Sequence, residues 1–165
     1  MRRIVPLLLL LTLVCTGCGK QAVPEDFSFA MTWNCYGVSS YDSATGVLVK
    51  TTDATHPEDY VTEYRLTESE RQQIRKLLQK LDAGSYPDEY DPNPEVKSEP
   101  SMTLILTVRT GAGEKTIRAE GIALGYPAAP TAAGRRFLET CRTIETLLTG
   151  TEAWQALPDY EFLYE

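Results

Sequence analysis

The chain has 165 residues and a formal net charge of −7, from 16 basic and 23 acidic side chains. An acidic surface of this kind is repelled by nucleic acid and by anionic lipid headgroups, which excludes nucleic-acid binding as a function. A hydrophobic share of 42% is sufficient for one domain of ordinary size with a core of its own.

The chain begins with an export signal. Two arginines at positions 2 and 3 precede an apolar run over residues 4–14, and the run ends in Thr16-Gly17-Cys18. Basic residues, a short apolar run and small residues at its end are the layout of a secretory signal. A membrane-spanning helix needs about 20 apolar residues, so the run is too short for a permanent anchor.

Thr16-Gly17-Cys18 resembles the lipobox of bacterial lipoproteins, in which a small residue precedes a cysteine that is lipidated and becomes the mature N-terminus. The resemblance implies that residues 1–17 are removed and that Cys18 carries two or more acyl chains, which anchor a protein stably. Cys15 is a rival acceptor, and an ordinary secretory signal with incidental cysteines is a further alternative.

Lipidation at Cys18 would place the protein on the extracytoplasmic face of the cell membrane, or at the outer membrane if the source has one. The expected membrane contact is then the N-terminal lipid alone. Residues 18–26 are polar and contain Pro24, and we interpret them as the lipidated N-terminus and a linker.

Strands alternate with turns in the first half of the mature chain. Residues 27–35 alternate apolar and polar side chains, as a half-buried strand does, and residues 47–51 and 60–66 are two further strands. Thr67 and Glu70 form a capping box, and Ile74, Leu77, Leu78 and Leu81 recur with helical spacing. We therefore predict a helix that begins at Thr67 and ends before Gly84.

The second half repeats the order of strands followed by a helix. Residues 85–100 contain several prolines and are predicted to be irregular, whereas residues 101–109 form the most hydrophobic and presumed central strand. Residues 114–120 complete a hairpin, and a second helix runs from Thr131 or Gly134 to Gly150. Residues 160–164 are a last strand or a packed arm.

These elements predict an α+β fold, with a mainly antiparallel sheet of about five strands and two helices packed on one face. Residues 27–165 would form a single domain. In general layout the mature domain also resembles small uncharacterised lipoproteins of anaerobic Gram-positive bacteria, a resemblance from which no activity can be transferred.

Two cysteines remain in the mature domain. Cys35 and Cys141 both fall on predicted apolar faces, and the extracytoplasmic compartment permits a disulfide between them. Two buried thiols are the alternative. The sequence predicts neither a metal site nor a cofactor, because the single histidine, His56, has no second histidine to join it in a zinc site.

Exposed aromatic side chains are the remaining functional signal. Tyr36, Tyr41, Tyr86 and Tyr90 fall in predicted loops or at strand ends, and tyrosine is enriched at protein interfaces. They are candidate recognition residues, and packing of loops onto the core is the alternative. No catalytic motif is present, so we expect a non-enzymatic module that binds a protein or envelope component. The alternatives are an inhibitor or immunity-type partner of a secreted hydrolase and a carboxylate-based envelope hydrolase.

Overall fold

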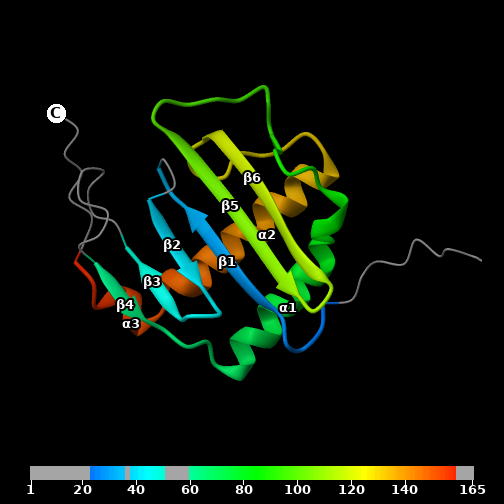
Figure 1. Cartoon of the computed structure of the whole chain (residues 1–165). Helices are drawn as coiled ribbons and strands as arrows, with labels where there is room; N and C mark the ends of the chain where they lie inside the picture. The colour runs from blue at the N-terminus through cyan, green and yellow to red at the C-terminus, as the bar shows by residue number, and fades with distance from the viewer. Residues whose placement is uncertain (1–22, 36–37, 51–59, 159–165) are drawn as a thin grey trace, which may run out of the picture.

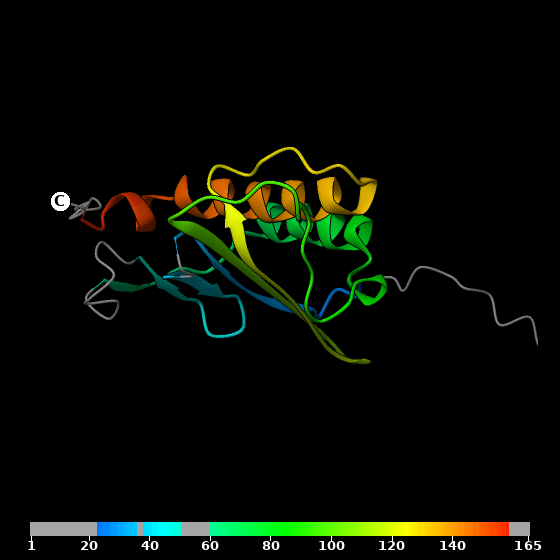
Figure 2. The ribbon, with the colours of Figure 1, turned by 90° about the horizontal axis from the view of Figure 1, so that it is seen from above.

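A computed structural model describes residues 23–35, 38–50 and 60–158, and these residues form an antiparallel sheet with helices on one face. The strand order is β4-β3-β2-β1-β5-β6. Figure 1 shows the sheet in front of the helices, and Figure 2 shows α1 and α2 on the same side of it. The strands are β1 (Ser28–Trp33), β2 (Ser39–Asp42), β3 (Val47–Val49), β4 (Val61–Glu63), β5 (Ser101–Thr110) and β6 (Gly113–Ala123).

The helices are α1 (Glu68–Leu81), the short 3-10 helix η1 (Ala83–Ser85), α2 (Ala132–Thr149) and α3 (Glu152–Gln155). A hydroxyl cap begins each of the three α-helices: Thr67, Thr131 and Thr151 accept a hydrogen bond from the backbone N–H three residues on. At α1 the cap is reciprocal, because the Glu70 carboxylate also accepts from the Thr67 backbone N–H at 2.7 Å. Caps of this kind satisfy N–H groups that the first turn leaves unpaired.

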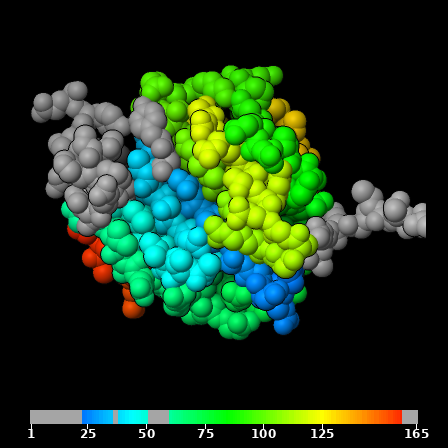
Figure 3. All heavy atoms as spheres, in the orientation of Figure 1, coloured from blue at the N-terminus to red at the C-terminus, as the bar shows by residue number. Residues whose placement is uncertain are grey.

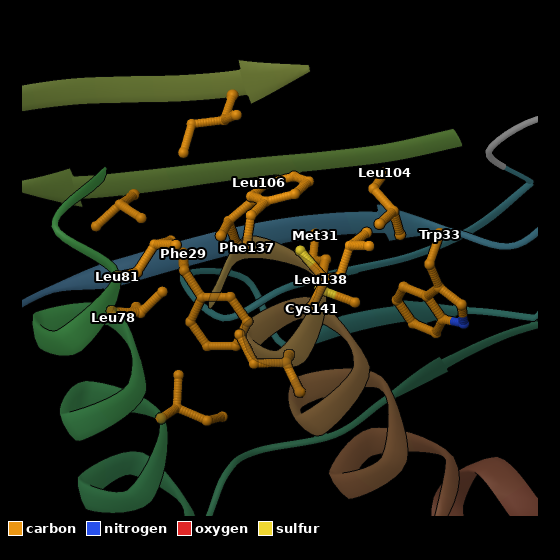
Figure 4. Packing of buried hydrophobic residues seen from close by; sticks show 14 of the residues in the cluster. Phe29, Met31, Trp33, Leu78, Leu81, Leu104, Leu106, Phe137, Leu138 and Cys141 are labelled. Atoms are coloured by element: carbon orange, nitrogen blue, oxygen red, sulfur yellow. The ribbon is translucent and has the colours of Figure 1, made fainter. Parts of the chain in front are cut away.

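The hydrophobic core lies between the sheet and the two long helices. Alternate residues of β1 and β5 point toward the helices, and apolar residues of α1 and α2 close the other side (Figure 4). The most deeply buried residues drawn there are Phe29, Met31, Trp33, Leu104, Leu106, Leu78, Leu81, Phe137 and Cys141. Amphipathic periodicity, which is 2 in the strands and 3.6 in the helices, therefore specifies a single core.

The predicted α+β class with helices packed on one face of an antiparallel sheet is confirmed, with six strands instead of about five. The additional strand is β2, which has a single large apolar residue, Tyr41. The expectation that residues 101–109 form the central strand is wrong: β5 is one strand from the edge of the sheet. Helix α1 ends earlier than predicted, because Asp82 at φ 57° takes the left-handed conformation that was assigned to Gly84.

Residues 23–27, which we call the strap, do not behave as a free linker. Val23 is buried, and its carbonyl accepts a hydrogen bond from Arg75 at 2.8 Å. Arg71 donates to the carbonyls of Glu25 at 2.6 Å and Phe27 at 2.9 Å, and its guanidinium lies 4.8 Å from the centre of the Phe27 ring. Hydrogen bonds from charged donors contribute about 1.5–3 kcal/mol each. The folded domain thus includes residues that the sequence assigned to the linker.

The outer edge of β6 is paired with the loop that follows η1. The Tyr90 N–H donates to the Arg118 carbonyl at 2.8 Å, and the Arg118 N–H donates to the Asp88 carbonyl at 2.7 Å. Asn93 is buried farther along the same loop, and its amide donates to the Ala128 carbonyl at 2.8 Å. The loop over residues 86–100 is therefore irregular, as predicted, and is fixed to the domain at several points.

None of the helices in the described ranges has both the length and the apolar character that crossing a membrane would require. The predicted export segment, residues 1–17, and the predicted last strand or arm, residues 160–164, lie outside the described residues.

Candidate functional site

The sheet has one face packed on the helices and one face away from them, and all six strands contribute to the second face. Figure 3 views this face directly, with β1, β2, β5 and β6 at its surface. We call it the open face. Its members are the residues that alternate with the core positions: Ser28, Ala30, Thr32, Ser40, Asp42, Val47, Val49, Val61, Glu63, Thr103, Ile105, Thr107, Arg109, Glu114, Thr116, Arg118 and Glu120.

The centre of the open face carries no charged side chain. Strand register places Thr107 of β5 opposite both Ala30 of β1 and Thr116 of β6, and it places Ile105 between Thr32 of β1 and Arg118 of β6, where the charged border begins. The Thr107 and Thr116 hydroxyls lie 2.9 Å apart and form a hydrogen bond. A sheet face turned to water usually carries polar, often charged, side chains, so small hydroxyl and methyl groups here are unexpected in a protein of net charge −7.

Charges border this centre on one side and are paired with one another. Arg109 binds Asp42 at 3.1 Å and Glu114 at 2.8 Å. Its side chain reaches from β5 to β2 across β1, where the residues at this end are the small Ser28 and Ala30. The hydrogen bond to Glu114 and the contact with Asp42 raise the pKa of Arg109, so the guanidinium remains charged.

A second border follows the β6 edge. Arg118 lies 3.1 Å from Glu120 and 3.7 Å from Glu89. Protein interfaces commonly combine a core depleted of charge with a polar, solvent-accessible rim. The open face has this arrangement.

The predicted recognition tyrosines are not on this surface. Tyr41 is 1% exposed, and its hydroxyl donates to the Tyr64 carbonyl; burial raises the pKa of Tyr41 to about 12. Tyr86 is buried against Phe137, and Tyr90 packs edge-on against both rings. These three tyrosines thus pack loops and a strand onto the core, which was the alternative interpretation. Tyr36 lies outside the described residues.

The predicted disulfide between Cys35 and Cys141 does not form. Cys141 is a fully buried thiol of α2, and burial raises its pKa. Cys35 follows Asn34, which has a φ of 75°, and it is half-buried opposite Met102 of β5. The predicted lipidation site, Cys18, lies outside the described residues.

A small hollow lies beside the strap, between the end of α1 and the β5–β6 turn. It has a volume of about 170 Å³, and its lining includes Val23 and the carboxylates of Asp82 and Glu114. Ligand sites usually have about 300–1,000 Å³, and Glu114 is already paired with Arg109. The hollow is therefore a poor fit for the glycan substrate of a carboxylate-based hydrolase. No three metal-ligating side chains converge anywhere in residues 23–35, 38–50 and 60–158.

The strongest perturbation of titratable groups is at Tyr126 and Glu145. The Tyr126 hydroxyl donates to the Glu145 carboxylate, and Tyr126 has a φ of 57°. Burial raises the pKa of both groups. Tyr126 lines a shallow surface hollow beside α2, but the hydrogen bond to Glu145 joins the loop after β6 to that helix, so we assign the pair a structural role.

Sequence reasoning missed the open face because its signal is spread over six strands. Strands β1, β2, β3 and β5 each show an alternation of buried and half-buried residues, and only the register brings Ala30, Ile105 and Thr107 together. The one sequence signal was the absence of charged residues at alternate positions 28, 30 and 32 of β1 and 103, 105 and 107 of β5. Comparison with protein-family models and with curated proteins finds no match for the chain.

Proposed function

We propose that this protein is an extracytoplasmic lipoprotein, anchored through Cys18, whose domain is a non-enzymatic module that binds a protein of the cell envelope through the open face. The observation that carries the proposal is the uncharged centre of this face, bordered by paired charges, in an otherwise acidic domain. The lipid anchor rests on the lipobox resemblance of Thr16-Gly17-Cys18.

The chemistry of the open face selects the class of partner. Its centre offers methyl and hydroxyl groups on a nearly flat surface, without a cationic cluster for phosphate or nucleic acid. Six strands spaced about 4.8 Å apart and about six residues long give a face of roughly 600 Å². A standard interface covers about 800 Å² on each partner, so the face suits a small, transient protein contact.

Site-specific crosslinking tests the binding surface. A photoreactive amino acid at Thr107, in the centre of the open face, should form an adduct with one envelope protein in cells. The same amino acid at Gln73, on the exposed side of α1, is the matched control and should form none. A second variant, Thr32→Arg, places a cation in the centre and should abolish the Thr107 adduct while the protein still folds.

The identity and site dependence of the adduct decide between the functions. Equal adducts from Thr107 and Gln73, or an adduct that survives Thr32→Arg, would contradict binding through the open face. A secreted hydrolase as the crosslinked protein would make this an inhibitor or immunity-type module.

The anchor is tested separately by mass spectrometry of the N-terminal peptide and by cell fractionation. We expect a mature chain that begins at Cys18 and carries a diacylglyceryl thioether, and we expect Cys18→Ala to release the protein from the membrane fraction. Lipid on Cys15, or membrane retention of the Cys18→Ala variant, would contradict the assignment.

A further inference from the structure

The strap determines where the chain leaves the folded domain. Val23, the first described residue, lies beside η1 and the β5–β6 turn, and we call this the near end. Strand β4 and helix α3 lie at the opposite end of the molecule, the far end, in both ribbon views (Figures 1 and 2). The chain thus emerges at one end of the long dimension of the sheet.

Two arginines of α1 hold the strap in place. Arg71 and Arg75 donate hydrogen bonds to three carbonyls of residues 23–27 at 2.6–2.9 Å, and Arg75 also lies 3.6 Å from the Glu25 carboxylate. Because both arginines bind backbone carbonyls, they can fix the strap to α1 although its sequence has no regular apolar pattern. Val23 and Phe27 are buried at the two ends of the strap.

This attachment shortens the connection to the lipid. Five residue steps separate Cys18 from Val23 and reach at most about 18 Å, whereas nine steps to Phe27 would reach about 32 Å. A domain of this size is roughly 37 Å across, from the usual relation between chain length and radius of gyration. With the strap bound, the chain from Cys18 to the domain therefore reaches only about half the width of the domain. With the strap released, it would reach almost the full width.

We infer that Arg71 and Arg75 are positioning residues that orient the anchored domain, with the near end facing the bilayer and the far end directed away from it. The inference rests on the proposed lipid anchor at Cys18. The open face runs from the near end to the far end. In this orientation it would stand roughly perpendicular to the bilayer, where a partner could reach it from the side. Its partner would then be another protein held close to the same membrane.

Energy transfer to labelled lipid headgroups tests the orientation in the full-length, lipidated protein on phosphatidylcholine vesicles. One fluorophore is placed at Gly84→Cys, at the near end, and another at Val61→Cys, at the far end, in a Cys35→Ser background. A side chain at Gly84 meets no atom within 4 Å, and Val61 is 55% exposed, so both sites accept a label. Cys141 is fully buried and remains unlabelled.

We expect transfer from position 84 to be at least about twofold stronger than from position 61, given the difference in distance along the domain. The double variant Arg71→Ala/Arg75→Ala should remove most of this difference. The matched control is Lys76→Ala/Lys80→Ala, which removes the same charge from a separate surface of α1. It should leave the difference unchanged, and circular dichroism should show that both double variants are folded.

Each outcome has one meaning. Equal transfer from the two positions in lipidated, vesicle-bound protein would overturn the orientation while leaving the anchor intact. An unchanged difference in the Arg71→Ala/Arg75→Ala variant would overturn the role of the arginines. Protein purified from cells that carries no lipid on Cys18 would overturn the anchor, and the orientation with it.

Discussion

Gly134 determines how closely α2 approaches the loop that precedes β5. A Cβ atom at this position would lie 2.6 Å from the Pro92 carbonyl oxygen and 2.8 Å from the Ala129 Cβ. Alanine is favoured over glycine within helices by about 1 kcal/mol, but forced contacts in a packed region cost about 1–3 kcal/mol. For alanine at position 134, the cost of these close contacts should therefore outweigh the gain in helix propensity.

We predict that Gly134→Ala lowers the free energy of unfolding by up to about 2 kcal/mol, as measured by urea denaturation. Gly84→Ala is the matched control, since its Cβ would meet no atom within 4 Å. That control should be neutral or slightly stabilising. A stabilising effect of Gly134→Ala would show that the loop moves away at little cost.

Because of Glu145, the free energy of unfolding should include a contribution that is larger in acid than at neutral pH. Burial raises the pKa of Glu145, against the opposing effects of the Tyr126 hydrogen bond and the Arg142 charge. A carboxyl whose pKa is raised on folding stabilises the fold when protonated. This contribution is complete below the ordinary glutamate pKa of about 4.3 and is lost as the pH rises through the folded value.

We predict that wild type loses stability relative to Glu145→Gln as the pH rises from about 4 to 7. Urea unfolding at a series of pH values measures the difference. Glu139→Gln, at an exposed position of the same helix, controls for the loss of a surface charge. A difference for Glu145→Gln that does not change with pH would contradict the raised pKa.

The cap of α1 connects that helix to the segment after β4. Glu70 accepts hydrogen bonds from the Thr67 N–H and hydroxyl and from the Tyr64 hydroxyl, each at 2.7 Å. Burial opposes ionisation of Glu70, but these hydrogen bonds outweigh it and lower its pKa. A carboxyl whose pKa is lowered on folding stabilises the fold above its unfolded pKa, and the contribution is lost as the pH falls through the folded value.

Glu70→Gln should therefore destabilise the domain at neutral pH and approach wild-type stability in acid, the opposite trend to Glu145→Gln. Thr67→Ala should cost about 1 kcal/mol, as is usual for loss of a helix cap. Thermal and urea unfolding of the two variants measure these effects. A Glu70→Gln effect that grows toward acid pH would contradict the capping role.

The two long helices were predictable because their signals are local. The Thr67 and Thr131 caps and the spacing of Ile74, Leu78 and Leu81 lie within a few residues of the elements they define. Strand β2 was missed because its half-exposed positions hold Ser40 and Asp42, which do not distinguish a strand from a turn. Helix ends and strands with few apolar residues depend on tertiary contacts that the local pattern does not contain.

The strap and the open face depend on contacts between distant parts of the chain, so no local pattern revealed them. The strap is held by Arg71 and Arg75, which follow it by more than forty residues and bind its backbone. The tyrosines were assigned to recognition by residue type, although Tyr41 and Tyr86 are buried. Composition identifies the residues that interfaces favour, whereas strand register determines which residues reach the surface.

The thiol state is a property of the whole domain that solution experiments can check. Because Cys35 and Cys141 are not joined, the domain should keep the same thermal midpoint with and without reductant. Denatured protein prepared without reductant should react with two equivalents of a thiol reagent. A loss of stability on reduction, or an increase in mass by two hydrogen atoms on reduction, would instead indicate the disulfide.

Pairing of the β6 edge with residues 88–90 affects how copies of the domain can associate at high concentration. An uncovered edge strand offers unpaired N–H and C=O groups to other chains and promotes edge-to-edge aggregation. At Arg118 both backbone groups already bind the loop, through Asp88 and Tyr90. The opposite edge strand, β4, has three residues and ends in Glu63. Copies of the domain brought close together would therefore meet edges that resist joining into continuous sheets.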